Sequence, residues 1–224
     1  MSSSRNKNII IAAVVAVVVV LAAVIALIAT SGSDDNGSSS DTTTVNGGGG
    51  AGVAAETQPV TVVGDPLPPF DAPENDTAIG SIPPTLEGFA FDGTSLSIAP
   101  GSTGRATMVV FLAHWCPHCN AEIPVLIEWN ESGAVPDNLD VIGVSTAVFD
   151  DRDNYPPSQW IDDKGFPWPV LADSENSDAA VAYGVTGFPT FTLIDENGKV
   201  LYRADGQKTL EELELIIATF FPST

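Results

Sequence analysis

The chain has 224 residues and a formal net charge of −21, from 29 acidic and only 8 basic residues. Such an acidic chain is not expected to bind nucleic acid, because the phosphates would repel it. Its length allows one or two domains, but the first quarter of the chain lacks the composition of a core, so we expect one folded domain.

The N-terminal segment contains the most hydrophobic run of the chain. Residues 9–29 form an uncharged stretch of Ile, Val, Ala and Leu, long enough as a helix to cross about 30 Å of hydrocarbon. Both charges before it are basic, Arg5 and Lys7, so the positive-inside rule places residues 1–8 in the cytoplasm and the rest outside. A cleaved signal peptide is the alternative, although the run exceeds the usual signal core of about 7–15 residues. We expect a single-pass anchor in the lipid bilayer.

Two further segments precede the predicted domain. Residues 30–58 are mostly Ser, Gly, Asp, Thr and Asn, a composition typical of a disordered linker. Residues 59–78 contain a Val-rich run and a Pro-rich cluster that favour extended chain without a sustained period, and we interpret them as a semi-ordered lead-in. The folded domain is predicted to span residues 79–224.

Strand patterns alternate with helix patterns in the second half of the chain. Five short apolar segments have the pattern of strands: 107–112, 139–145, 169–172, 190–194 and 199–203. Four segments have helical spacing: from Cys116 to a stop at Gly133, 158–164, about 175–183, and Leu210 to Phe220. We expect the first two strands to be buried on both faces, the third to lie at an edge, and the last two to form a hairpin. The order predicts an α/β fold with a central mixed sheet flanked by helices.

Both cysteines of the chain lie in one four-residue motif, Cys116-Pro117-His118-Cys119. No cysteine is left for a structural bridge, so the pair is expected to serve chemistry or to bind a metal. The motif joins a strand to the start of a helix, where free N–H groups and the helix dipole stabilise a thiolate. We therefore predict that Cys116 is the nucleophile and that Cys119, one turn further, is the resolving thiol.

His118 lies between the two cysteines. Its protonated imidazole would stabilise the thiolate and so the reduced pair, which makes the disulfide a stronger oxidant. A zinc site would need four ligands, and His114, His118 and the two cysteines are too crowded to enclose one ion. Haem attachment is excluded because Asn120 follows Cys119. The motif predicts thiol–disulfide exchange with no metal and no cofactor.

Motifs around the cysteines resemble those of a known family. The sequence Trp115-Cys116-Pro117-His118-Cys119 after an apolar strand, together with Gly187-Phe188-Pro189-Thr190 before the hairpin, resembles the thioredoxin fold. Glu122-Ile123-Pro124 completes the pattern W-C-x-x-C-x-x-E-x-P, which is similar to the membrane-tethered TlpA/ResA-like branch. The resemblance covers about residues 79–224 and implies a thioredoxin-like domain.

The resemblance also implies roles for residues outside the cysteine pair. Pro189 would follow a cis peptide bond, face the cysteines and order the substrate, leaving the backbone of Phe188 free to pair with it. Trp115 and Phe188 would form an apolar rim around Cys116, and we place Pro117 with them among the substrate-binding residues.

Glu122 would handle the proton of the resolving cysteine by the same resemblance. A solvated first-turn carboxylate that stabilises the helix start is the alternative. Thioredoxins carry a buried carboxylate six residues before the first cysteine, where this chain has Val110. Proton transfer by that second route is therefore not expected.

The direction of electron flow stays open at this point. Pro117-His118 resembles the oxidase DsbA, whereas the TlpA-like branch is often reductive. We expect an extracytoplasmic oxidoreductase that exchanges disulfides with exported proteins, with a slight preference for a disulfide donor, recycled by a membrane redox partner. The alternatives are a TlpA/ResA-like reductase that supports cytochrome c maturation and a non-enzymatic copper-handling module, since soft thiolates bind Cu(I).

Overall fold

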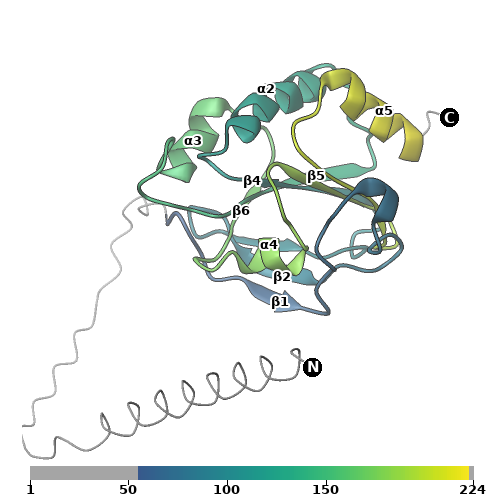
Figure 1. Cartoon of the computed structure of the whole chain (residues 1–224), viewed down its shortest axis with the longest axis horizontal. Helices are drawn as coiled ribbons and strands as arrows, with labels where there is room; N and C mark the ends of the chain where they lie inside the picture. The colour runs from purple at the N-terminus through teal and green to yellow at the C-terminus, as the bar shows by residue number, and fades with distance from the viewer. Residues whose placement is uncertain (1–54, 222–224) are drawn as a thin grey trace, which may run out of the picture. The chain divides into compact units, whose positions relative to one another are not determined.

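The structure, a computed structural model, describes residues 55–221 (Figure 1). The strands of this part are β1 (Thr61–Val63), β2 (Thr85–Phe89), β3 (Ser95–Ile98), β4 (Ala106–Leu112), β5 (Leu139–Ser145), β6 (Val170–Ala172), β7 (Thr190–Ile194) and β8 (Val200–Asp205). They form one sheet in the order β1-β2-β6-β5-β4-β7-β8, with β3 paired to β2. Because β4 is parallel to β5 and antiparallel to β7, the sheet is mixed, as predicted.

Helices cover both faces of this sheet. They are η1 (Pro73–Asn75), α2 (Pro117–Glu131), α3 (Pro157–Lys164), α4 (Asp178–Ala182) and α5 (Leu210–Phe220). Figure 1 shows α2, α3 and α5 on one face and α4 on the other. The predicted α/β fold with a central mixed sheet flanked by helices is confirmed for the described residues.

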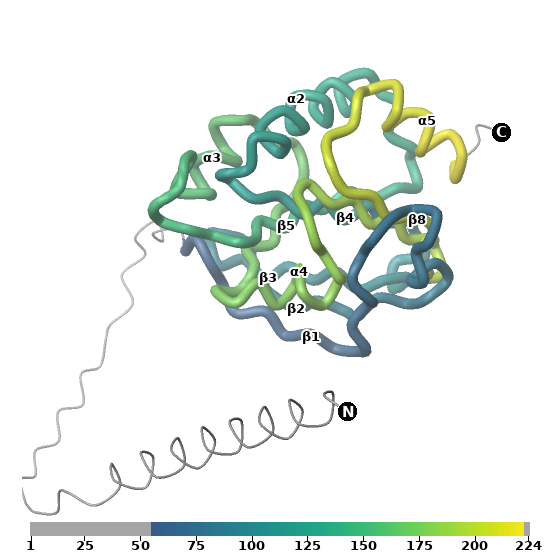
Figure 2. The backbone as a smooth tube through the Cα atoms, viewed as in Figure 1, coloured from purple at the N-terminus to yellow at the C-terminus, as the bar shows by residue number. Residues whose placement is uncertain are grey.

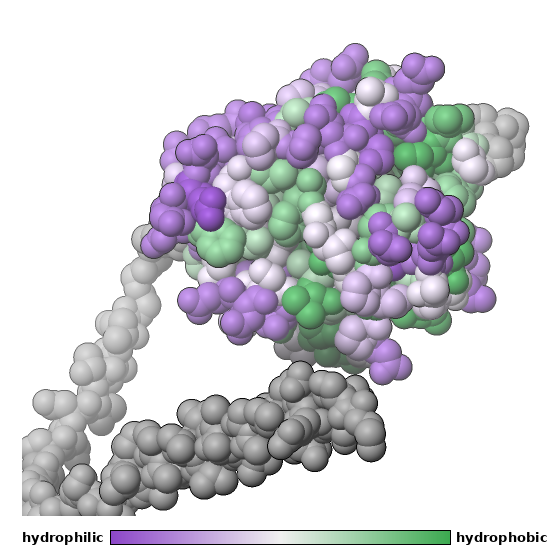
Figure 3. All heavy atoms as spheres, viewed as in Figure 1, coloured by the Kyte–Doolittle hydropathy of each residue, from purple (hydrophilic) through white to green (hydrophobic). Residues whose placement is uncertain are grey.

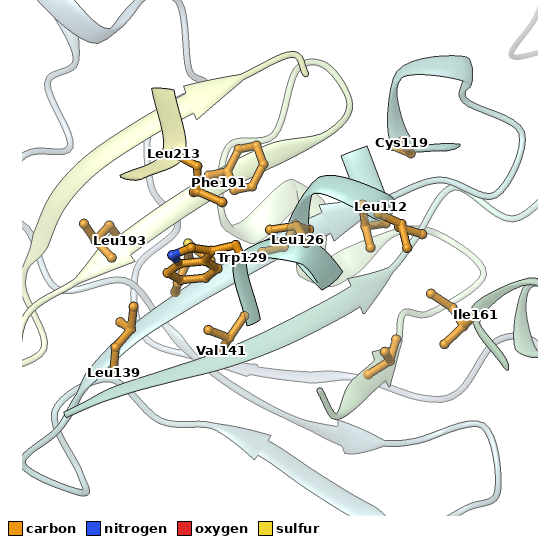
Figure 4. Packing of buried hydrophobic residues seen from close by; sticks show 14 of the residues in the cluster. Leu112, Cys119, Leu126, Trp129, Leu139, Val141, Ile161, Phe191, Leu193 and Leu213 are labelled. Carbon is orange, nitrogen blue, oxygen red and sulfur yellow. The ribbon is translucent and has the colours of Figure 1, made fainter. Parts of the chain in front are cut away.

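The central strand β4 supplies both halves of the core. All its residues are buried, and alternate side chains point to opposite faces. Met108 and Val110 pack with α2 and α5, whereas Val109 and Phe111 pack with α4. Figure 4 shows Leu126 and Trp129 of α2 directed at the sheet, among side chains from β5, β7 and α5. The start of α2 is thereby held against the end of β4.

Several predicted elements are confirmed within a residue or two. The segments 107–112, 139–145, 190–194 and 199–203 correspond to β4, β5, β7 and β8. The prediction of an edge strand at 169–172 is wrong, because β6 lies between β5 and β2. The helix predicted at about 175–183 is shorter in the structure, where it corresponds to α4.

The segment 59–78 differs from the semi-ordered lead-in that its composition suggested. It contains β1, which pairs with β2, and its apolar residues Leu67, Phe70 and Ala78 are buried. In Figure 2 the dark blue chain that carries η1 runs beside β8, and Gly80 donates a backbone hydrogen bond to Val200. The folded unit therefore includes residues before 79, because β1 forms an edge of the sheet and the buried apolar residues of this segment belong to the core.

The hairpin of β2 and β3 was not predicted from the sequence. Its turn contains Asp92-Gly93, where Asp92 accepts a hydrogen bond from the backbone N–H of Thr94 at 2.9 Å and Gly93 has a φ of +82°. An Asp-Gly pair between apolar segments is a recognised hairpin signal, so the sequence did carry the information.

The N-terminal predictions concern residues that the structure does not describe. The cytoplasmic segment 1–8, the anchor 9–29 and most of the linker 30–58 lie outside the described residues. Between residues 55 and 221, none of the helices has the length and apolar character required to cross a membrane.

Candidate active site

The two cysteines occupy the junction between β4 and α2. Cys116 is the N-cap of α2, with extended backbone angles, and Pro117 is the first helical residue. Proline suits this position because its missing N–H would have no partner within the helix anyway. The strand-to-helix setting predicted for the motif is therefore confirmed.

The two thiols have different surroundings. Cys116 is 6% exposed and its S–H donates to the carbonyl oxygen of Phe188 at 3.5 Å. Cys119 is 0% exposed, and its sulfur accepts from the backbone N–H of Ala113 at 3.5 Å. Burial raises the pKa of Cys119 far above its usual range, and the nearby Cys116 and Glu122 add to this effect. Cys116 is thus the thiol that a partner can reach, and Cys119 is held behind it as a neutral thiol.

The loop before β7 lies beside Cys116. The peptide bond between Phe188 and Pro189 is cis, as the resemblance implied. The hydrogen bond from Cys116 to Phe188 brings this loop, 72 residues away in the sequence, against the cysteine pair. Thr190 closes the loop by donating its hydroxyl to the carbonyl oxygen of Gly187 at 2.7 Å.

Glu122 is a buried carboxylate one turn after Cys119. Its side chain is 0% exposed, and Oε2 accepts from the backbone N–H of Lys208 at 2.6 Å, while Oε1 has no hydrogen-bond partner in the structure. Burial raises the pKa of Glu122 to about 7, against the lowering effect of the Lys208 N–H and ammonium groups. The alternative of a solvated carboxylate is contradicted by this burial.

The first turn of α2 carries the two remaining residues of the motif on its surface. Pro117 and His118 are both exposed, whereas the cysteines on either side of them are buried. A charge on His118 therefore lies at the helix N-terminus and in contact with solvent. Its predicted effect on the redox potential stays a prediction.

Aromatic side chains gather beside Cys116, and the predicted rim residues Trp115 and Phe188 contact each other there. The ring of Trp115 lies edge-on to Phe188 with centroids 6.1 Å apart, and 6.0 Å from the ring of Phe149. Trp115 also donates its indole N–H to the carbonyl oxygen of Ala147 at 2.7 Å. We call Trp115, Phe149 and Phe188 the aromatic rim; Phe149 is a member that sequence reasoning missed.

His114 is a second residue whose part in the site was missed. It is fully buried; the N–H of Phe149 donates to its Nε2 at 3.2 Å, which leaves Nδ1–H to donate to the carbonyl oxygen of Asp153 at 2.7 Å. Both ring nitrogens are occupied, so His114 is not free to bind a metal. Over residues 55–221 there is no group of three or more His, Cys, Asp or Glu side chains that could hold a metal ion.

The fold and the paired cysteines beside a cis-proline define a thioredoxin-like dithiol protein. Comparison with protein families agrees, because the Redoxin family model matches residues 62–216. The chain belongs to the Redoxin family. Solved structures share the fold: the thioredoxin domain of a thiol–disulfide oxidoreductase from Bacteroides vulgatus superposes with a TM-score of 0.51 at 24% identity, covering 64% of this chain and 97% of that one. A DsbF homologue from Corynebacterium diphtheriae gives 0.52 at 20% identity, covering 68% and 99%.

Curated relatives narrow the branch of the family. The thiol:disulfide interchange protein CycY of Rhizobium leguminosarum bv. viciae is 30% identical over 47% of this chain and 53% of its own length. The thiol-disulfide oxidoreductase ResA of Bacillus thuringiensis is 30% identical over 50% and 61%. The thiol:disulfide interchange protein DsbE of Vibrio cholerae is 33% identical over 46% and 51%. The chain thus spans between half and three fifths of the length of these relatives.

Proposed function

We propose that this chain is an extracytoplasmic thiol–disulfide oxidoreductase that exchanges disulfides with exported proteins through Cys116 and Cys119. The observation that carries the proposal is the pair itself: a reachable thiol at the N-cap of α2, a buried thiol behind it, and cis-Pro189 alongside. Relatives named for thiol–disulfide interchange support this class of reaction.

The reaction divides the work between the two sulfurs. In the reductive direction the Cys116 thiolate attacks one sulfur of a substrate disulfide, that bond breaks, and the first substrate thiolate leaves and takes up a proton. Cys119 then attacks the sulfur of Cys116, which forms the protein disulfide and releases the second substrate thiol. Two electrons pass from the protein pair to the substrate, and donation of a disulfide is the same sequence in reverse.

Glu122 serves the second of these steps. Cys119 cannot attack as a neutral thiol, and burial strongly disfavours its thiolate. A carboxylate with a pKa of about 7 is half ionised near neutral pH, so it can take the thiol proton and later return it. The unpartnered Oε1 is the atom free to accept that proton.

The surrounding residues position the substrate. The resemblance to thioredoxin-fold proteins implies that the backbone of Phe188, which precedes Pro189, pairs with an extended substrate segment. Trp115 and Phe188 supply the apolar contact on either side of Cys116, and Pro117 lies exposed at its edge.

We favour a disulfide donor over a reductase, because His118 at the helix start stabilises the reduced pair. A reductase of the ResA and DsbE kind is the second candidate, and the names of those relatives are the observation in its favour. We further propose that residues 9–29 anchor the chain in the membrane, where a membrane redox partner recycles the pair. Protease accessibility of residues 55–221 on intact cells tests this placement.

The full chain in detergent micelles tests the reaction class. It should catalyse either the reduction of insulin by dithiothreitol or the oxidative refolding of a reduced protein. Cys116→Ser should abolish both activities, and Cys119→Ser should accumulate a mixed disulfide with the substrate. Unchanged catalysis in Cys116→Ser would rule the proposal out.

Equilibration with glutathione decides between the two directions. A reduction potential near ~−120 mV indicates a donor, and one near ~−270 mV indicates a reductase.

A further inference from the structure

The loop between β5 and α3 is built into the site rather than left free beside it. Four hydrogen bonds hold residues 147–154 to the two residues before Cys116. Three of them involve His114: its ring donates to the carbonyl of Asp153 and accepts from the N–H of Phe149, and its own carbonyl accepts from the side chain of Asn154 at 2.9 Å. The fourth runs from Trp115 to the carbonyl of Ala147.

This loop places one large apolar side chain in the solvent against Trp115, the residue before Cys116. Phe149 is 48% exposed, although it contacts Trp115. The guanidinium of Arg152 lies 5.9 Å from the centroids of both rings, so a cation–π contact fixes their relative position. An exposed aromatic ring is unfavourable in the free protein, and here the loop that carries it is held in place by four partly buried hydrogen bonds.

We propose that Phe149 is a specificity-determining residue: with Trp115 and Phe188 it receives the apolar side chain that flanks the reacting cysteine of a substrate polypeptide. The inference rests on the proposed function, because the substrate chain must reach Cys116.

The position of Cys116 determines which part of a substrate lies near the aromatic rim. Cys116 is bonded to Trp115 in the chain and lies 3.5 Å from the carbonyl of Phe188, so any cysteine joined to it sits at the rim. Neighbouring Cα atoms are about 3.8 Å apart, so the flanking side chains of the substrate come within reach of these rings.

The charge of the loop excludes another kind of flank. Asp150, Asp151 and Asp153 are exposed in the same loop, and Asp151 lies 3.7 Å from Arg152. Carboxylates on both sides of the single cation disfavour an acidic substrate segment. The rim thus selects for apolar flanks and against acidic ones.

The test compares two peptides of equal charge in the Cys119→Ser background, using the full chain in detergent. Each peptide has one cysteine, flanked on both sides by Leu or by Ser, and carries thionitrobenzoate in a disulfide. Cys116 attacks the peptide sulfur, the old disulfide breaks, and the thionitrobenzoate thiolate that leaves is measured by absorbance. This assay does not depend on the natural direction of electron flow.

We expect the Leu peptide to react about tenfold faster than the Ser peptide, the scale of one aromatic contact. Phe149→Ala should reduce that ratio below about threefold, whereas Leu215→Ala, an exposed apolar residue of α5, should keep it. Equal rates in the unaltered rim, or an unchanged ratio in Phe149→Ala, would overturn the inference and leave the proposed function intact. No reaction with either peptide would instead overturn the proposed function.

A variant of His114 tests whether the hydrogen bonds of this residue position the loop that carries Phe149. His114→Leu removes both ring hydrogen bonds, and it should lower the Leu-to-Ser ratio as Phe149→Ala does. If His114 were only a structural residue, both rates would fall together and the ratio would stay the same, which would contradict its positioning role.

Discussion

At the residue scale, Glu122 has the least ordinary surroundings of the site. A carboxylate usually keeps its charge by staying in water or beside a cation. Here one oxygen accepts a backbone N–H and the other has no partner, so burial dominates and the pKa rises to about 7. The same burial that weakens the folded state above this pH gives the carboxylate a pKa suited to the proton transfer that we propose for Glu122.

The raised pKa of Glu122 predicts how stability depends on pH. Between pH 4.5 and about 7 the unfolded chain has released the proton while the folded chain retains it, so the free energy of unfolding falls as the pH rises. The loss amounts to roughly 3 kcal/mol across this window. Glu122→Gln should remove this loss and be more stable than the unaltered chain at pH 8, with little difference at pH 4.5.

Urea denaturation at the two pH values measures this effect. Glu128→Gln, an exposed residue of the same helix, serves as the matched control and should show no such pH dependence. A constant difference between Glu122→Gln and the unaltered chain at both pH values would show that folding does not raise the pKa of Glu122.

His118 carries the prediction about redox direction. If a protonated His118 stabilises the reduced pair, as proposed, His118→Ala should make the protein more reducing. A shift of the potential by about −30 mV corresponds to roughly 1.4 kcal/mol for a two-electron couple. Equilibration of both proteins with glutathione measures the shift, and an identical potential would remove His118 from the mechanism.

At the scale of elements, the first turn of α2 is tied to its neighbours by Asn120. Its amide group donates to the carbonyls of His114 and Cys116, each at 3.1 Å, and its oxygen accepts the indole N–H of Trp160 at 3.0 Å. One side chain therefore joins α2, the loop before it and α3. The cysteine pair is held where these three elements meet.

Asn120→Ala should lower the free energy of unfolding by about 2 kcal/mol, because it breaks these bonds and leaves the buried N–H of Trp160 without a partner. Asn130 lies on the same helix and its side chain has no hydrogen bond to another residue of 55–221, so Asn130→Ala should change stability much less. Urea denaturation of both variants gives the comparison. Equal losses would mean that the cost comes from the helix and not from the Asn120 contacts.

At the scale of the whole molecule, the segment before β2 is fastened to the far end of the sheet. Arg203 of β8 and Asp76 form an ion pair in which each side chain is 1% exposed, with Arg203 Nε donating to Asp76 Oδ2 at 2.8 Å. Arg203 also donates to the carbonyls of Pro68 and Tyr183, both at 3.0 Å. Burial raises the pKa of Asp76, but the bonds and charge of Arg203 and the N–H of Ala78 outweigh it and lower the pKa.

Removal of one partner of this pair should be costly. Asp76→Ala leaves the Arg203 charge buried and unpaired, and we expect a loss of about 3–5 kcal/mol. Asp71→Ala, an exposed residue of the same segment, is the matched control and should be nearly neutral. Thermal and urea unfolding measure both variants. If Asp76→Ala proved as stable as Asp71→Ala, the segment would not be fastened in the way described.

The surface of the described residues is polar over much of the face that Figure 3 shows. On the face seen in Figure 3, hydrophilic residues predominate, and hydrophobic ones gather near the C-terminal end of α5, where Phe220 and Phe221 are half-buried. The net charge of −21 is carried by the whole chain. At low salt this charge should attract basic partners and repel acidic ones.

Local patterns were sufficient to predict β4, the start of α2, the β7–β8 hairpin and the position of the two cysteines at a strand-to-helix junction. Each of these features depends on residues that are close in the sequence, within one strand or one or two helical turns. A helix cap, a hydrophobic period or a C-x-x-C spacing can be recognised within so short a segment. The cis-proline came from the resemblance of Gly187-Phe188-Pro189-Thr190 to a family motif.

Only the tertiary structure decided the surroundings of these residues. Glu122 owes its raised pKa to burial, which outweighs the opposing effect of Lys208, 86 residues away, and Phe149 reaches the site through His114, 35 residues before it. β6 is an inner strand because it pairs with β2, and β2 was not predicted from the sequence. Sequence alone determined which residues can do the chemistry, because reactivity begins with residue type and local backbone. The burial, charges and contacts around these residues come from distant parts of the chain, which only folding brings together.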